Sequence, residues 1–194
     1  MFRWSRLLLS LFIFCGLVLF CAVLYLQQPI PEEVVPHVEI PVKVSIGVPK
    51  RLIIPVIAIN SNVLHTGITK LGEMEVPSSI VDVGWYKFGS RPGEKGSAVI
   101  DGHFGSVKGV PGIFNDLSKL KKGDLLSVFD SAGASTTFKV RETRLFGEND
   151  LASSVFFSND DKAHLNLITC EGIWNKARKS YSGRLVIFTD LVVK

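Results

Sequence analysis

A stretch of twenty residues without a charge, from Leu7 to Leu26, constrains this chain more than any other feature of its sequence. As a helix rising about 1.5 Å per residue, it spans roughly 30 Å, the thickness of the hydrocarbon core of a bilayer. Arg3 and Arg6 precede the stretch and acidic residues follow it, so the positive-inside tendency places residues 1–6 in the cytoplasm. The stretch therefore predicts a single-pass transmembrane helix at 7–26, with the rest of the chain on the outer side of the cell membrane.

A cleaved signal peptide is the competing interpretation of this stretch. The apolar region of a signal peptide is usually about 7 to 15 residues long and ends in a small-x-small site. Residues 24–28, Leu-Tyr-Leu-Gln-Gln, contain no such site. We therefore expect the helix to be retained as an anchor, and we interpret Cys15 and Cys21 as small apolar residues within it.

The segment that follows is dense in proline, with five of the nine prolines of the chain at positions 29, 31, 36, 41 and 49. Proline at this density favours extended polyproline-type backbone and makes a semi-rigid spacer. We predict an extracytoplasmic stalk at 27–46, which separates the membrane from a domain at 47–194.

The domain predicted at 47–194 is long enough for one hydrophobic core but not for two equal domains. Short runs of β-branched and aromatic residues, punctuated by glycine, indicate an all-β sandwich or barrel. The predicted strands are Arg51–Ile54, Ser97–Ile100, Leu125–Phe129, Thr136–Leu145, Leu165–Thr169 and Leu185–Val193. One helix is expected at 113–120, where apolar residues recur at helical spacing before Lys121-Lys122-Gly123.

The charge of the chain points to no particular partner. Arg3 and Arg6 supply two of the four net positive charges. No cluster of basic residues is interleaved with aromatics in the way that a nucleic-acid surface needs, so we expect no nucleic-acid partner.

Cys170 is the only cysteine outside the apolar stretch, and it has no disulfide partner on the same side of the membrane. It is therefore either a free thiol with a chemical use or a buried structural cysteine, and the spacing alone leaves both open. A nucleophilic thiol needs an adjacent base, because free cysteine is only a few per cent thiolate at neutral pH.

Among the four histidines, His103 is the best candidate for that base. His37 lies in the predicted stalk, and His65 follows a loop-like Asn60-Ser61-Asn62. His164 is six residues before Cys170 on one predicted strand, roughly 20 Å away if that strand is extended. His103 instead follows a strand within a glycine-flanked loop, where catalytic groups are commonly carried.

Acyl transfer also develops negative charge on a carbonyl oxygen, which a fixed cation can stabilise. Arg184 opens the last apolar run, fourteen residues after Cys170, and would lie beside Cys170 if the two strands pair. Arg178 is the rival, and the residues alone do not decide between them.

Together these residues resemble the sortase family. The string Leu167-Ile168-Thr169-Cys170 is similar to the family's TLxTC signature, with a strand-glycine-histidine upstream and an arginine before an apolar strand downstream. Further similar segments, which extend the resemblance over residues 47–194, are Arg51–Pro55, Val83–Tyr86, Pro92–Gly93, Ala98–Ile100, Phe114–Leu117 and Gly123–Asp124.

The resemblance implies a closed sortase-type β-barrel of about eight strands with one or two short helices. It also implies a cysteine transpeptidase and thiol endopeptidase, which cleaves an LPxTG-like sorting signal of secreted proteins and holds the acyl part as a thioester. The acyl part then passes to an amine, such as that of a peptidoglycan precursor. By the same resemblance Cys170 is the nucleophile, His103 the acid and base, and Arg184 the residue that stabilises the oxyanion and positions substrate.

Several residues depart from the family pattern. Asn166 replaces the first threonine of the signature, Asp101 stands where a small residue is frequent, and Glu171 follows the cysteine. The Gly84-Trp85-Tyr86 and Pro92-Gly93 segments resemble the smaller classes E and F. The stalk lacks the Asp-Pro-aromatic lid of pilin-building members, and no carboxylate cluster suggests calcium, so we expect no cofactor and no metal.

Two alternatives come from other classes of protein. One is another cysteine acyl-transferase or peptidase of cell-wall peptides. Papain-like peptidases place cysteine before histidine, and L,D-transpeptidases expect a Gly-Cys pair, which residues 167–171 do not contain. The other is a non-catalytic, membrane-tethered β domain that binds wall or partner proteins and in which Cys170 is merely buried.

Overall fold

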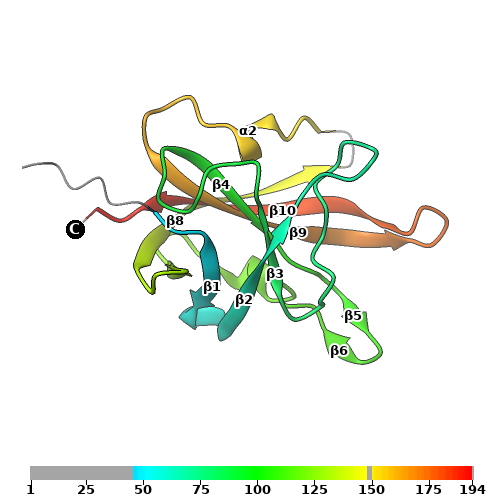
Figure 1. Cartoon of the computed structure of the whole chain (residues 1–194). Coiled ribbons are helices and arrows are strands. Elements are labelled where there is room, and N and C mark those ends of the chain that lie inside the picture. The colour runs from blue at the N-terminus through cyan, green and yellow to red at the C-terminus, as the bar shows by residue number, and fades with distance from the viewer. Residues whose placement is uncertain (1–45, 148–149, 194) are drawn as a thin grey trace, which may run out of the picture. The chain divides into compact units, whose positions relative to one another are not determined.

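The computed structural model describes residues 46–147 and 150–193 (Figure 1), which belong to the second of two units of the chain, Val44–Lys194. The described strands are β1 (Pro49–Ile54), β2 (Ile59–Thr66), β3 (Val83–Tyr86), β4 (Gly96–Asp101), β5 (Ser106–Val107), β6 (Val110–Pro111), β7 (Leu125–Asp130), β8 (Ser135–Gly147), β9 (Ala163–Asn175) and β10 (Ser180–Leu191). The described helical elements are short: the α-helix α2 (Ser153–Phe156) and the 3₁₀ turns η1 (Pro55–Ile57) and η2 (Leu117–Lys119).

Eight of these strands close into one barrel, in the order β1-β2-β3-β4-β9-β10-β8-β7. β1 closes the barrel by pairing with β2 on one side and with β7 on the other. The β2–β3 and β4–β9 pairs are parallel, and the other pairs of the barrel are antiparallel. The all-β fold, the closed barrel of about eight strands and the few short helices are thus confirmed.

The sheet formed by β4, β9 and β10 is covered on both faces. Leu165, Leu167 and Ile187 are fully buried in the main core of the barrel. The alternate side chains of the same strands point outward, where Val99 and Val186 join a second apolar cluster beneath α2. Burial on both faces explains why β4 carries the continuous apolar run Ala98–Ile100 rather than an alternating pattern.

The helix expected at 113–120 is wrong, because this segment forms consecutive turns with η2 as its only regular piece. Its backbone hydrogen bonds join residues three apart, as in Leu117 N–H to Phe114 O and Leu120 N–H to Leu117 O. Phe114, Leu117 and Leu120 are all buried against the barrel. A helical spacing of apolar residues is therefore satisfied here by turns that bury the same side chains.

The segment before His65 is also different from the expectation. Asn60-Ser61-Asn62 lies within β2, not in a loop, and its exposed asparagines alternate with buried Ser61 and Val63. The alternation of exposed and buried positions is that of a strand, although asparagine has a low strand propensity.

No helix within residues 46–147 and 150–193 is long and apolar enough to span a membrane. The predicted transmembrane helix at 7–26 and the predicted stalk up to residue 45 lie outside the described residues.

Candidate active site

Cys170 and Arg184 are direct cross-strand neighbours. They are Cα partners in the antiparallel β9–β10 pair, which places their side chains on the same face of the sheet. Cys170 is a free, half-buried thiol, and the Arg184 side chain is exposed, with Nη1 donating to the carbonyl oxygen of Gly183 at 3.0 Å. The structure therefore shows the pairing of the strands of Cys170 and Arg184, on which the sequence-based placement of Arg184 depended.

The backbone before His103 is held against the strand that carries Cys170. Gly102 N–H donates to Ile168 O at 3.2 Å, and Thr169 Oγ1 donates to Gly102 O at 2.7 Å. A Cβ on Gly102 would lie 2.5 Å from a ring carbon of Phe114, so only glycine lets Phe114 pack against this backbone. His103 thus follows β4 at the level of Cys170 on the neighbouring strand.

The imidazole of His103 is oriented by a backbone carbonyl. Its Nε2 lies 2.7 Å from Pro77 O, in the connection between β2 and β3. Because a carbonyl oxygen only accepts, Nε2 carries the proton in this arrangement and Nδ1 is left for proton transfer. Sequence reasoning missed Pro77, since nothing in the sequence links it to a residue 26 positions away.

The three residues predicted for the site line one cavity of about 340 Å³. The rest of its wall includes Glu73, Met74 and Val76 from the β2–β3 connection, Asp101 from β4 and Phe156 from α2. The cavity therefore joins the β9–β10 hairpin, which carries Cys170 and Arg184, to the segment after β4, which carries His103 and lies more than sixty positions earlier in the chain.

The electrostatics of this cavity act on the thiol in opposite directions. Burial raises the pKa of Cys170, the positive charge of Arg184 lowers it, and the carboxyl group of Asp101 raises it. The net direction is upward, so the resting thiol keeps its proton at neutral pH. A reaction at Cys170 therefore needs a base to take that proton.

Asp101 was noted in the sequence only as a departure from a pattern, and the structure places it inside the cavity. Burial raises its pKa to about 8, although its own backbone N–H opposes the shift. The position of an acidic residue at the end of an otherwise apolar strand is the one sequence signal that could have identified it.

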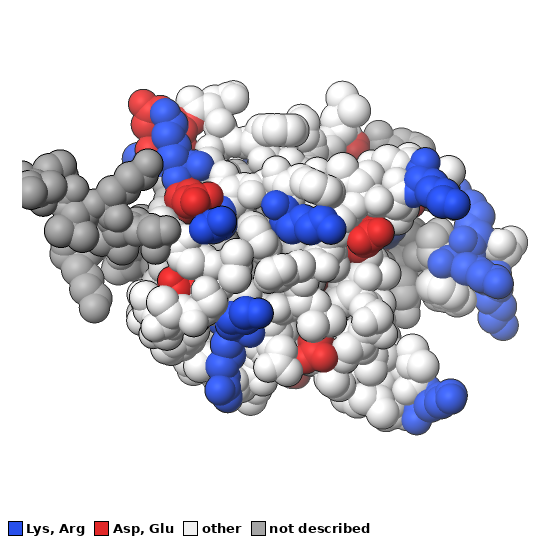
Figure 2. Space-filling model, viewed as in Figure 1, with Lys and Arg blue, Asp and Glu red and all other residues white. Residues whose placement is uncertain are grey.

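Arg178 lies apart from the cavity, in the turn at 176–179 between β9 and β10. Its backbone N–H donates to the side chain of Asn175 at 3.1 Å. Lys176 and Lys179 share this turn, and Figure 2 shows Lys and Arg side chains gathered at the end of the hairpin. Arg178 lies in the turn before β10, which begins at Ser180. Arg184 lies four strand positions beyond Ser180, about 13 Å along the strand, so the two arginines occupy different places.

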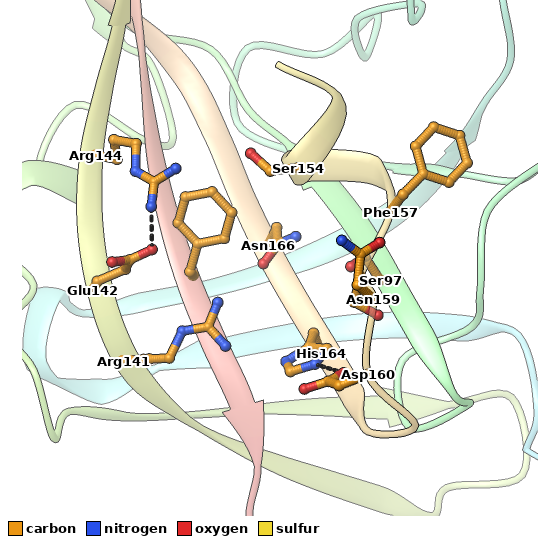
Figure 3. Close-up of a pocket in the computed structure, with 12 residues that line it drawn as sticks. Ser97, Arg141, Glu142, Arg144, Ser154, Phe157, Asn159, Asp160, His164 and Asn166 are labelled. Carbon is orange, nitrogen blue, oxygen red and sulfur yellow. Dashed lines mark hydrogen bonds and ion pairs between the residues drawn. The ribbon is translucent and has the colours of Figure 1, made fainter. Parts of the chain in front are cut away.

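His164 belongs to a second cavity of about 370 Å³ (Figure 3). His164 lies six positions from Cys170 on β9, so the two side chains point to the same face of the strand. Its ring is buried, with Nε2 2.7 Å from Asp160 Oδ1 and Nδ1 2.9 Å from Asp190 Oδ1. The hydrogen bond to His164 holds the pKa of Asp160 below its ordinary range. Both nitrogens of His164 are therefore occupied by carboxylates, while His65 is exposed on β2 with its ring edge-on to Trp85.

The cavities offer no evident metal centre. Within residues 46–147 and 150–193, no group of three or more His, Cys, Asp or Glu side chains could hold a metal ion.

Comparison with known proteins places this arrangement in a family. The model of the sortase domain matches residues 52–192. Sortase C-1 from Actinomyces oris is similar in structure, with a TM-score of 0.59 and 23% identity over 74% of this chain and 73% of that one. Sortase C1 from Streptococcus agalactiae has a TM-score of 0.58 and 22% identity, with 75% of this chain and 67% of that chain covered. Sortase A from Corynebacterium diphtheriae has a TM-score of 0.56 and 20% identity, with 78% of this chain and 64% of that chain covered.

At these identities the solved structures establish the fold alone. No curated protein sequence matches the chain. The family model, however, covers most of the chain and the whole barrel from β1 to β10 except the first residues of β1. The chain therefore belongs to the sortase family of cysteine transpeptidases.

Proposed function

We propose that this protein is a membrane-anchored sortase that cleaves an LPxTG-like sorting signal and transfers the acyl part to an amine. The observation that carries the proposal is the cavity in which Cys170 lies opposite Arg184 and shares a wall with His103. Anchoring is supported by the charge-free stretch at 7–26, with the catalytic domain outside the cell.

In the first half of the reaction, Cys170 Sγ attacks the carbonyl carbon of the scissile peptide bond. The thiol proton passes to His103 Nδ1, the ring nitrogen that Pro77 O does not engage. The carbon–nitrogen bond then breaks, His103 returns the proton to the leaving amine, and a thioester remains on Cys170.

In the second half, an amine attacks the thioester carbon and loses a proton to His103. The carbon–sulfur bond breaks, the new amide leaves, and Cys170 recovers its proton. A secreted protein with a sorting signal is thus the first substrate, and an amine of the cell wall or of another protein is the acceptor.

Arg184 is proposed to stabilise the oxyanion in both halves. Its guanidinium starts from the strand position directly opposite Cys170, and its charge already lowers the pKa of the thiol. A fixed cation beside the reacting carbon needs little reorganisation when charge develops on the carbonyl oxygen.

We also propose that the enzyme belongs to class E or F. The support is the Gly84-Trp85-Tyr86 and Pro92-Gly93 segments and the absence of an Asp-Pro-aromatic sequence in residues 27–46. Pilin polymerisation is accordingly not the proposed task.

The proposal is tested by a peptide-library cleavage screen with the full chain in detergent, with and without added amines, read by mass spectrometry. A transpeptidase gives amide products that incorporate the amine, whereas a peptidase gives only acids. Cys170→Ala serves as the control and should give neither product nor thioester. Products that persist with Cys170→Ala, or no product from any library peptide, would contradict the proposal.

A further inference from the structure

Asp101, Cys170 and Arg184 lie on three adjacent strands with their side chains on the same face of the sheet. In the parallel β4–β9 pair, Asp101 is the Cα partner of Ile168, two positions before Cys170. Since partners share a face and alternate residues return to it, the Asp101 side chain is a diagonal neighbour of the thiol. The thiol therefore lies between a carboxyl group on one side and a guanidinium on the other.

The Asp101 carboxyl group is enclosed. The residue is 8% exposed, and its Oδ1 has no hydrogen-bond partner among the described residues. This oxygen occupies the space above Gly84, where a Cβ would lie only 2.6 Å from it. An ionised carboxylate so enclosed normally has several donors. Here its own backbone N–H is outweighed by burial, which favours the neutral acid.

The other charged groups that face Asp101 are few. Arg184 on β10 lies beyond the thiol, His103 follows on the same segment, and Glu73 approaches from the β2–β3 connection. Glu73 and Arg184 are both exposed to solvent. Exposed charges are screened by solvent, which weakens the effect of Glu73 and Arg184 on the enclosed Asp101 carboxyl group. On the pKa of the thiol, the charge of Arg184 has the larger effect and that of Asp101 opposes it.

We propose that Asp101 controls the reactivity of Cys170 through its own proton. When Asp101 is neutral, Arg184 is the charge that acts on the thiol and favours the thiolate. When Asp101 loses its proton to solvent, a negative charge lies beside the sulfur and opposes the thiolate. Asp101 is thus a positioning residue that acts through Cys170, and its role rests on the proposed function of Cys170 as nucleophile.

The proposal requires Asp101 to change charge near the working pH of the enzyme. Burial raises its pKa to about 8, which puts the change in that range. Below about pH 7 the neutral acid dominates and the site behaves as if Asp101 carried no charge. Above about pH 8 the ionised Asp101 carboxylate opposes ionisation of the Cys170 thiol, which therefore titrates at a higher pH than it would beside a neutral residue.

The test is the rate of Cys170 alkylation by iodoacetamide from pH 5 to 10, with the full chain in detergent at constant ionic strength. Asp101→Asn is the variant, because it keeps the shape of the side chain without a titratable proton. We expect the two rate profiles to coincide below about pH 7 and to separate above about pH 8. The midpoint for Asp101→Asn should lie about 0.5 to 2 pH units lower.

Asp116→Asn is the matched control. It removes an exposed carboxylate that pairs with Lys119 outside the cavity, so its change in net charge equals that of Asp101→Asn at the pH values where Asp101 is ionised. Its profile should follow that of the unaltered chain. Coincident midpoints for the unaltered chain and Asp101→Asn would overturn the proposal, and so would a variant that is faster at every pH, since Asp101 would then be charged throughout.

A second measurement needs no variant at position 101. The ¹³C shift of the Asp101 carboxyl carbon, followed by NMR in aspartate-labelled protein, should titrate near pH 8, and titration below about pH 5 would overturn the proposal. Both experiments report on thiol and carboxyl group without a sorting signal. Failure of peptide cleavage therefore counts against the proposed function, whereas an unchanged alkylation profile counts against the role of Asp101.

Discussion

Thr169 donates its hydroxyl proton to the carbonyl oxygen of Gly102 over 2.7 Å, and the bond is buried. It joins the residue before Cys170 to the residue before His103. The separation of nucleophile and base is therefore set by one side-chain hydrogen bond between two parallel strands, in addition to their backbone ladder.

Replacing Thr169 with valine should weaken both stability and catalysis. Valine has the shape of threonine but leaves Gly102 O without its donor, at a cost of about 1–3 kcal/mol in the free energy of unfolding. We expect the rate of thioester formation to fall as well, because His103 loses part of its support. Denaturant unfolding and single-turnover kinetics measure the two effects.

Thr189→Val is the matched control for this prediction. Thr189 Oγ1 donates to Leu165 O at 2.6 Å, also buried, and lies five positions from Arg184 along β10. The control should lose similar stability and keep its rate. Equal loss of rate in both variants would mean that the bond at Thr169 has no specific effect on the site.

Arg184→Ala should reduce kcat by about 100- to 1,000-fold without unfolding the barrel, because the side chain is exposed but lies opposite Cys170. Arg178→Ala, in the turn at 176–179, should have little effect on turnover. Steady-state kinetics with a sorting-signal peptide, together with circular dichroism, test both. An inactive Arg178→Ala beside an active Arg184→Ala would move the oxyanion role to Arg178.

Gly84→Ala should destabilise the barrel by about 1–3 kcal/mol. Its methyl group would lie 2.6 Å from both Asp101 Oδ1 and a methyl carbon of Thr66, and both side chains are buried. Gly147→Ala, whose methyl group would meet nothing closer than 3.4 Å, is the control and should be nearly neutral. Thermal unfolding of the two variants side by side measures the difference, and equal melting temperatures would contradict the crowding at Gly84.

Asp101 should make the barrel less stable as pH rises. Its pKa is raised from 3.8 to about 8 in the folded state by burial. Because the folded value exceeds the unfolded one, its stabilising contribution is complete below about pH 4 and is lost as pH rises to about 8. The melting temperature of the unaltered chain should therefore fall more between pH 5 and pH 8 than that of Asp101→Asn. If the melting temperatures of the two proteins fell equally between pH 5 and pH 8, Asp101 would be charged in the folded protein.

The sequence predicted the parts of this fold that local pattern determines. Apolar runs located β1, β4, β7, β8, β9 and β10, and the interval from Cys170 to Arg184 was consistent with the hairpin that joins them. The helix at 113–120 was wrong because the spacing of Phe114, Leu117 and Leu120 suits both a helix and consecutive turns.

Contacts between distant segments could not be predicted in this way. The parallel pairing of β4 with β9 depends on the order of strands around the barrel, which no local pattern specifies. The same is true of Pro77 O beside His103 and of the enclosure of Asp101 above Gly84. The residues of the site could be nominated from the sequence, but their mutual placement and the state of Asp101 depend on the closed sheet.

The two sides of the catalytic cavity come together by different routes as the chain folds. A turn at 176–179 joins β9 to β10, so Cys170 and Arg184 can meet in a local hairpin, an event of about 1–10 μs. β4 reaches β9 across the 67 positions that separate Gly102 from Thr169, and closing so long a loop costs more conformational entropy. We expect a partly folded chain to bring Cys170 and Arg184 together before His103 reaches them. The base would then be missing until β4 pairs with β9, and the chain would be inactive until the sheet is complete.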